Sequence, residues 1–380
     1  MISDSHFYES RDISHSLRIL PANCLTFDEL YAHYRDVGFL YPKKLERLSP
    51  HLDLIKQNWE RAWSAGRELM WTLAYIEQRN NAMGTVTTWR TAEGGWQAQH
   101  LTSQKNPAGV IFLLLSAQDE GMIMNYNSGQ NWYSPTNKFA MRIYGGMADM
   151  LGENLAFSCL LNYLELNPRL LSKADTHFKT VECTDRDSGL IKDMAILCRG
   201  KVYCDGEELA GDDMGLSALD KRYRKYGLSR KRHIWLAIDR TNSEVKGMII
   251  AYRGPFGFNF SFLENRCDVL VHPGVDENQR EKVCTLLLRT ASEAYFNDAS
   301  SPEYPISHLV VMADDPCAAT LTRLGAVKTR QYNQGVWLRQ GFGAWKQYME
   351  KVFDRVMQRF DRQNQKRNKT IVTLEGGQEL

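Results

Sequence analysis

Four landmarks occur twice along this chain of 380 residues, in the same order and with similar spacing. Each half has a strand-like segment, then a glycine that begins a second strand ending in an aromatic residue and an arginine. A histidine near the end of a third strand follows, 13 or 14 residues before a triple leucine. The first strand-like segments are 71–76 and 234–239, and the strands that begin at a glycine run from Gly84 to Arg90 and from Gly247 to Arg253. The histidines are His100 and His272, and the triple leucines are 113–115 and 286–288. Such self-similarity predicts that the two halves fold alike.

The segments around the landmarks have the same predicted secondary structure in both halves. Branched and aromatic residues flanked by Asn, Ser or Gly predict strands, and apolar residues at helical spacing predict helices. In the first half we expect helices at 27–35 and 42–65, strands at 69–76, 82–89 and 96–101, the leucine helix, a strand at 122–126, a helix at 135–144 ending at Gly145, and a strand at 155–164. In the second half the same elements are 189–198, 216–226, 233–238, 246–252, 267–272, the leucine helix, 308–312, 316–324 ending at Gly325, and 335–338.

A strand-helix-strand passage next to antiparallel strands predicts a parallel pair with a right-handed crossover. The predicted fold class is therefore α/β, with two tandem copies, each a mixed and mostly antiparallel central sheet flanked by helices. No low-complexity linker separates the copies, so we expect them to share an interface. The predicted ranges are 1–26 for an N-terminal extension, 27–172 and 173–340 for the two copies, 341–368 for a C-terminal amphipathic helix, and 369–380 for a flexible tail.

The composition excludes several classes of protein. The 47 Lys and Arg nearly balance the 45 Asp and Glu, so overall charge gives no reason to expect binding to nucleic acids or membranes. No apolar run approaches the roughly 18 to 20 residues needed to cross a bilayer, and the polar N-terminus is unlike a signal peptide, so we expect a cytoplasmic protein. The eight cysteines lack the spacing of a disulfide framework or a zinc site, so we expect reduced thiols and no bound metal.

The second half resembles the GNAT acyltransferase superfamily, in which a helix ending in Leu-Gly precedes a last strand. Leu324 and Gly325 match this signature, and the strand to Leu338 follows. The first half resembles the family only through the duplication. The resemblance implies an N-acyltransferase that moves an acyl group from acetyl-CoA or another acyl-CoA to the amine of a small molecule or peptide. The alternative is a catalytically silent tandem module that binds a nucleotide, a metabolite or a protein.

In this family the acyl-CoA pyrophosphate lies at the start of the leucine helix, where backbone N–H groups are unpaired. Gln279 fits the family pattern, but Lys282 and Cys284 stand where small residues are expected. The cofactor-binding residues that the resemblance implies are Leu270, Val271, Gly274, Gln279, Arg280, Lys282, Val283 and Cys284. In the first half only Gly109 leaves room for a phosphate, so we expect a degenerate copy that does not bind acyl-CoA.

Acyl transfer needs a base for the amine and an acid for the leaving thiolate. The candidate bases are Glu264, Asp268 and His272 in the second copy and His100 in the first, although a histidine on a strand is also a common core residue. GNAT enzymes often use a Tyr shortly before the Leu-Gly as the acid, a position that we assign to Leu321 and, in the first copy, to Met141. The expected substrate-binding residues are Arg253, Trp132, Tyr133 and Asn137, the last three in a polar loop that either lines a crevice beyond a strand or packs as an ordinary loop.

Two further segments suggest partners. Seven Lys or Arg lie between Lys221 and His233, which suits an acidic or phosphate-bearing ligand at Lys221 to Arg232 or simply an exposed helix and turn. The apolar stripe of the C-terminal helix, from Trp345 through Met349, Phe353 and Met357 to Phe360, predicts packing across the two copies or a homodimer.

Overall fold

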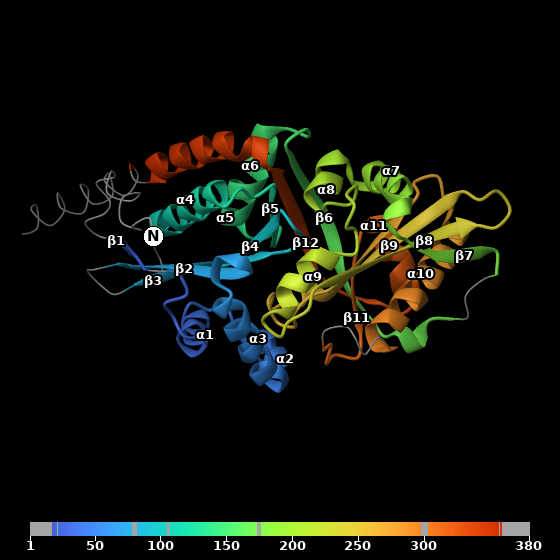
Figure 1. The fold of residues 1–380 in the computed structure, drawn as a ribbon, viewed down its shortest axis with the longest axis horizontal. Helices are drawn as coiled ribbons and strands as arrows, with labels where there is room; N and C mark the ends of the chain where they lie inside the picture. Colours follow the sequence, from blue (N-terminus) through green and yellow to red (C-terminus); the bar gives the residue numbers. More distant parts are fainter. Residues whose placement is uncertain are drawn as a thin grey trace, which may run out of the picture.

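The computed structural model describes residues 17–20, 22–77, 82–104, 107–172, 176–297, 303–356 and 358. A single sheet of twelve strands forms its centre, in the order β1-β2-β3-β4-β5-β12-β6-β11-β10-β9-β8-β7, with helices on both faces (Figure 1). No helix of the described ranges is both long enough and apolar enough to span a membrane.

The elements of the first copy follow the predicted order closely. They are β1 (Leu17–Ile19), α1 (Phe27–Asp36), α2 (Pro42–Leu48), α3 (Leu52–Ser64), β2 (Met70–Glu77), β3 (Met83–Arg90), β4 (Gly95–Ser103), α4 (Pro107–Ile123), β5 (Ser128–Tyr133), α5 (Lys138–Ala140), a π-helical turn (Met141–Gly145), α6 (Gly146–Leu151) and β6 (Ala156–Leu166).

The second copy repeats this order, with small differences in its helices. Its elements are β7 (Phe178–Glu182), α7 (Ser188–Arg199), α8 (Lys201–Gly206), α9 (Ser217–Arg224), β8 (Lys231–Asp239), β9 (Val245–Arg253), β10 (Arg266–Val271), α10 (Glu277–Asn297), β11 (Leu309–Ala313), α11 (Asp315–Arg323) and β12 (Val327–Leu338).

The two copies exchange their last strands. Strand β6, from the first copy, pairs with β11 of the second, and β12, from the second copy, pairs with β5 of the first. The exchanged strands also pair with each other, from Val327 opposite Glu165 to Trp337 opposite Ala156, at the centre of the sheet. Strands β1 to β6 of the first copy correspond to β7 to β12 of the second. When each strand in the order is replaced by its counterpart, the same order results, read from the opposite edge of the sheet, as a pseudo-twofold axis requires. The ranges 27–172 and 173–340 therefore describe the chain order, while in space each sheet half is completed by the other copy.

Close packing explains why both copies have a glycine at these equivalent positions. Gly84 and Gly247 lie near the starts of β3 and β9, and each of these strands ends at the expected arginine. A Cβ at Gly84 would come within 2.2 Å of the Tyr75 ring, and one at Gly247 within 2.6 Å of Val283 Cγ1. No side chain fits at either position without moving its neighbours.

Two predicted elements of the first copy were wrong. The strand expected at 122–126 is instead the end of α4 and the turn after it, and the true strand begins at Ser128. The helix expected to end at Gly145 continues to Leu151, because Gly145 has helical dihedral angles and Gly152 is the residue with a positive φ, 71°.

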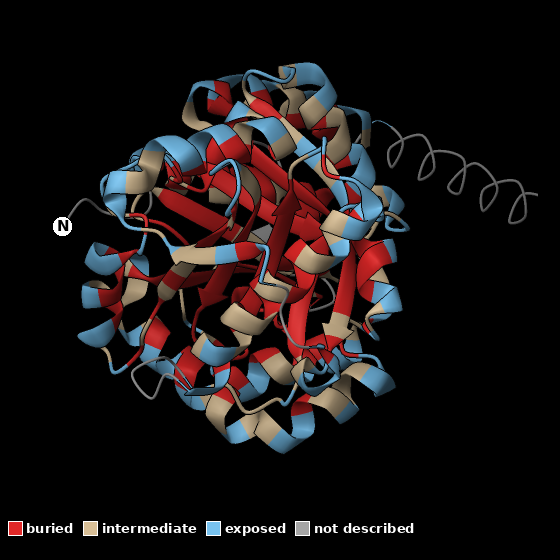
Figure 2. Ribbon diagram, turned by 90° about the vertical axis from the view of Figure 1, so that its right-hand side faces the viewer, coloured by how far each residue is buried: buried red, intermediate tan, exposed pale blue. Residues whose placement is uncertain are grey.

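The core is buried along the length of the sheet, as the red strands of Figure 2 show. A helix at 342–356 packs on α4 in the first copy, where Trp345, Met349 and Phe353 are buried in one cluster with Leu114. The described part of its apolar stripe is therefore covered by the first copy of the same chain, not by a second protein chain. Met357 and Phe360 lie outside the described residues. All eight cysteines are free thiols, as expected.

Candidate functional site

A cavity of about 460 Å³ opens where two parallel strands of the first copy separate. Strands β4 and β5 pair over three positions, and the last pair is Gln97 with Gln130. Beyond this pair, Ala98 and Gln99 of β4 and Trp132 of β5 line the cavity. The side chain of Gln99 crosses the gap, and its Nε2 donates to the carbonyl of Trp132 at 3.1 Å.

A β-bulge shapes one wall of the cavity. The register between β3 and β4 shifts between Thr85 and Thr87, so β4 carries an extra residue, while β9 and β10 pair without a shift. His100 lies at this bulge with a φ of 55°. A non-glycine residue in this left-handed region is strained by about 1 to 3 kcal/mol, and such strain concentrates at functional sites.

The equivalent strands of the second copy also pair over three positions, but their pairing extends two residues further along the strand. Thr87 and Ile250 are equivalent, because each lies three residues after the shared glycine of its strand. Gln99 pairs with Thr87, and Asp268 pairs with Ile250, so Gln99 and Asp268 occupy equivalent positions. At Asp268, β10 is still paired with Met312 of β11. The strands separate in the first copy at a position where those of the second remain hydrogen-bonded.

The helices that follow these strands also differ in charge. At the start of α10, the Asp276 carboxylate accepts from the backbone N–H of Gln279 at 2.8 Å, and Glu277 pairs with Arg323 at 2.7 Å. The first turn of α4 contains no acidic residue. Because carboxylates repel a phosphate from a helix N-terminus, the start of α10 is an unfavourable place for a phosphate.

The cofactor-binding residues predicted in the second copy do not share one face. Four of them are buried in the core, and the other four lie at the surface around the start of α10. The buried residues are Leu270, Val271, Val283 and Cys284, and the others are Gly274, Gln279, Arg280 and Lys282. The guanidinium of Arg280 donates to the carbonyl of Val275 at 2.9 Å.

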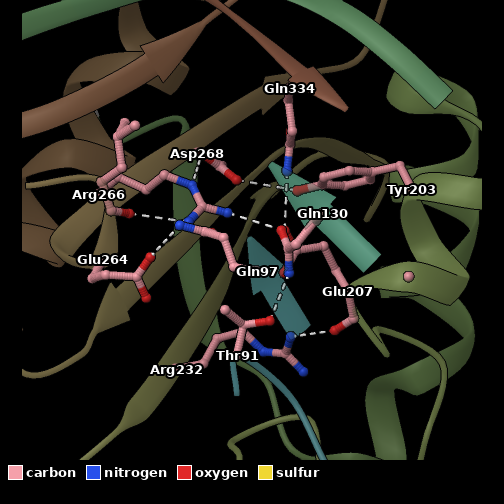
Figure 3. A network of polar contacts seen from close by, with 12 residues as sticks. Thr91, Gln97, Gln130, Tyr203, Glu207, Arg232, Glu264, Arg266, Asp268 and Gln334 are labelled. Atoms are coloured by element: carbon pink, nitrogen blue, oxygen red, sulfur yellow. Dashed lines mark hydrogen bonds and ion pairs between the residues drawn. The ribbon is translucent and has the colours of Figure 1, made fainter. Parts of the chain in front are cut away.

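Two of the predicted bases belong to a buried network of ion pairs. Glu264 accepts from Arg230 Nη1 at 2.6 Å and, across the interface between the copies, from Gln97 Nε2 at 2.8 Å. Asp268 accepts from Arg266 Nε at 3.0 Å (Figure 3). Each side chain of these two ion pairs is at most 2% exposed. The network joins the two copies, and neither carboxylate lines the cavity.

The two histidines are not equivalent, contrary to the sequence prediction. Gly84 pairs with Ser103, and Gly247 pairs with Val271, so the residue equivalent to His272 is Gln104. His272 follows the end of β10 at the surface and accepts from the N–H of Gly274 at 3.0 Å. His100 lies inside β4.

His100 is enclosed by aromatic rings and borders the cavity. It is 3% exposed and stacks between Trp59, at a centroid distance of 5.3 Å, and Phe260, at 4.5 Å. Neither ring nitrogen has a hydrogen-bond partner within the described ranges. Burial, and then the charge of Lys44, hold the pKa of His100 well below its ordinary value of 6.5, so its imidazole is neutral at neutral pH.

Tyr144 occupies the position at which the sequence prediction had placed Met141. Asn137 caps α5, Asp314 caps α11, and the seventh residue after each cap is Tyr144 or Leu321. The sequence prediction placed the acid four residues before Gly145, but the helix does not end at Gly145. When the positions are counted forward from the N-cap Asn137, the residue equivalent to Leu321 is Tyr144. Tyr144 is buried, lies within a π-helical turn and lines the cavity. Burial raises its pKa, so the hydroxyl keeps its proton at neutral pH.

Three of the four residues predicted to contact substrate line this cavity, namely Trp132, Tyr133 and Asn137. Arg253 does not line it. Its guanidinium is buried against the rings of Tyr295 and Tyr304, at 4.5 and 4.8 Å.

The cavity lies between the copies. Phe39 and Lys44, from the α1–α2 region, form part of its wall. The second copy contributes Phe260 and Ser261 from the loop after β9, and the exchanged strand β12 contributes Tyr332. The second copy and the exchanged strand therefore complete a site that is centred on the first copy.

The arginines of the basic segment from Lys221 to Arg232 form ion pairs and hydrogen bonds with other residues of the chain. Arg222 pairs with Glu93 at 2.5 Å, Arg224 with Asp220 at 2.6 Å, and Arg230 with Glu264. Arg232 donates to the carbonyls of Met214, Glu207 and Glu208. These contacts account for much of the segment without a phosphate-bearing ligand.

No protein-family model matches this chain, and no curated protein matches it. Solved structures of similar fold include a tandem GNAT protein from the clavulanic acid biosynthesis pathway, with 11% identity, a TM-score of 0.40, and coverage of 85% of this chain and 98% of that chain. Another is a putative acetyltransferase from Pyrococcus horikoshii, with 10% identity, a TM-score of 0.43, and coverage of 88% of this chain and 93% of that chain. A third is a GCN5-related N-acetyltransferase from Anabaena variabilis, with 8% identity, a TM-score of 0.35, and coverage of 84% of this chain and 72% of that chain. These likenesses concern the fold alone. The strand order confirms the two tandem copies of a mixed sheet that were expected from the sequence.

Proposed function

We propose that this chain is an acyl-CoA-dependent N-acyltransferase whose active site lies in the first copy. The observation that carries the proposal is the opening between β4 and β5 beyond Gln97, which leads to a cavity with an unpartnered imidazole and a protonated tyrosine hydroxyl. This location differs from the second-copy site that the sequence favoured, because there β10 and β11 remain paired as far as Asp268 and carboxylates occupy the helix start.

The residues present fit an acyl-CoA. The backbone of β4 after Gln97 is free of β5, so an extended pantetheine arm would find polar groups beside Ala98 and Gln99. The start of α4, without acidic residues, suits the pyrophosphate. When bound, acyl-CoA supplies a thioester whose acyl carbon an amine can attack.

Each proton transfer of the reaction has a candidate residue in the cavity. As the new C–N bond forms and the C–S bond breaks, the amine must lose a proton and the sulfur must gain one. The neutral His100 accepts the amine proton, and Tyr144 donates the proton that the leaving sulfur takes. The second copy acts as a structural partner that supplies part of the acceptor wall.

A pair of isosteric variants tests the location. Gln104→Glu adds a negative charge just before α4 and keeps the oxygen that accepts from Met83 N, so we expect acetyl-CoA to bind about 3- to 30-fold more weakly. Gln279→Glu adds the same charge to α10, and we expect no change in affinity. Calorimetric titration of both variants and the wild type with acetyl-CoA gives the measurement.

The same titration separates the alternatives. If only Gln279→Glu weakens binding, the cofactor lies in the second copy. If the wild type shows no binding at millimolar acetyl-CoA, the catalytically silent module is the correct description and the enzyme proposal fails.

A further inference from the structure

One cation that lines the cavity, Lys44, and one beside it, Arg330, have no carboxylate partner among the described residues. Lys44 lines the cavity, and its Nζ lies 4.0 Å from the centroid of the Phe39 ring. Arg330 donates to the hydroxyls of Tyr332, at 3.3 Å, and Tyr41, at 3.4 Å. Within the part of the chain that the structure describes, neither cation forms an ion pair.

The surrounding charges leave this region positive. Arg47, on the same helix as Lys44, is paired with Glu165 at 2.7 Å, and the other group near Glu165 is His308, at 3.9 Å. Burial, and then the charges of Arg330 and Arg47, lower the pKa of Lys44 to about 7. A partly buried cation without a counter-ion is unfavourable, and an anionic ligand removes that cost.

The rest of this wall is mainly aromatic. Phe39, Trp132, Phe260 and Tyr332 line the cavity near His100, and Ser261 bonds to the Tyr332 hydroxyl at 2.9 Å. Such a wall binds an apolar or aromatic body and leaves a charged group of the ligand to be held by the cations.

We propose that the acceptor is an amine that also carries a carboxylate and an apolar body, such as an apolar amino acid, and that Lys44 binds the carboxylate with Arg330 behind it. This proposal rests on the proposed function and adds the class of substrate. Positive charge near the acceptor also lowers the pKa of its ammonium group, so a larger fraction of the amine is deprotonated at neutral pH.

Two probes that differ by one carboxylate test the proposal on the full chain. N-acetyl-L-phenylalanine and N-acetylphenethylamine mimic the acylated product with and without the carboxylate. We expect calorimetry to show that the first binds about 10- to 100-fold more tightly, the range for a charge-assisted hydrogen bond. Lys44→Met should abolish this difference, and Lys44→Arg should keep most of it. Lys43→Met, at the exposed neighbouring position, should change nothing.

Equal affinity for the two probes, or an equal loss of both in Lys44→Met, would overturn the proposal. Titration of Lys44→Met with acetyl-CoA separates this result from a failure of the proposed function, because we expect its acetyl-CoA affinity to match that of the wild type. If the wild type binds N-acetyl-L-phenylalanine through Lys44 but does not bind acetyl-CoA, the carboxylate site stands and the acyltransferase does not.

The same interaction should depend on pH. Lys44 is charged below its pKa of about 7 and loses its charge above it, so N-acetyl-L-phenylalanine should bind more tightly at pH 6 than at pH 9. The charged or titratable groups that act on Lys44 from other elements are Arg330 and His100, and the pKa of His100 lies well below its ordinary value of 6.5. A pH-independent affinity in the wild type would contradict the role of Lys44.

Discussion

Replacing Tyr144 by Phe is expected to lower the turnover number for acetyl transfer by about 10²- to 10⁴-fold, the usual contribution of a general acid. The substitution removes the buried hydroxyl and keeps the ring, which packs against Tyr133 at 5.5 Å and Trp337 at 6.1 Å. The affinity for acetyl-CoA should therefore be unchanged. The turnover can be measured as release of the CoA thiol with L-phenylalanine, the class of acceptor inferred above.

A matched substitution at the equivalent position of the second copy gives the control. Leu321→Ala removes side-chain volume where Tyr144 would lie in the second copy, and a stable variant should keep its turnover number. If Tyr144→Phe transfers acetyl groups as fast as the wild type, another group protonates the leaving sulfur and our assignment of the acid is wrong.

Replacing Glu264 by Ala is expected to lower the free energy of unfolding by about 3 to 5 kcal/mol, because Arg230 is then left buried without a counter-charge. Gln97 of the first copy loses its acceptor in the same variant. Replacing both partners by apolar residues, Arg230→Met with Glu264→Leu, should recover much of this loss, because no unpaired charge remains. Denaturant titration of the three proteins measures the effect.

A surface pair with similar geometry provides the reference for this prediction. Glu93 and Arg222 are 42% and 39% exposed and lie 2.5 Å apart, so Glu93→Ala should cost about 0 to 1 kcal/mol. Should Glu264→Ala prove as stable as the wild type but lose activity, Glu264 would be a catalytic residue, as its position in the sequence first suggested, and not part of the framework.

Local patterns in the sequence were enough to predict most elements and their order. At positions 84 and 247 the packing leaves no room for a side chain, so each copy has a glycine there. This shared glycine marked the strands around it in the sequence. The exchange of β6 and β12 could not be predicted, because it depends on pairing between residues more than a hundred positions apart, and either strand is apolar enough for either half of the sheet.

The site was harder to predict because it depends on backbone geometry. The sequence favoured the second copy because Leu324, Gly325 and Gln279 match the family pattern there, although Lys282 and Cys284 stand where small residues are expected. The bulge at His100 and the separation of β4 from β5 have no signature in single residues. Tyr144 was missed for a different reason, since Gly145 resembles a helix end although its dihedral angles are helical.

Amide hydrogen exchange with and without acetyl-CoA tests the central claim most directly. An acyl-CoA held between β4 and β5 should slow exchange in residues 98–104 and 131–134 and leave residues 269–284 of the second copy unchanged. Protection confined to residues 269–284, or no protection in either region at saturating acetyl-CoA, would contradict the assignment of the active site to the first copy.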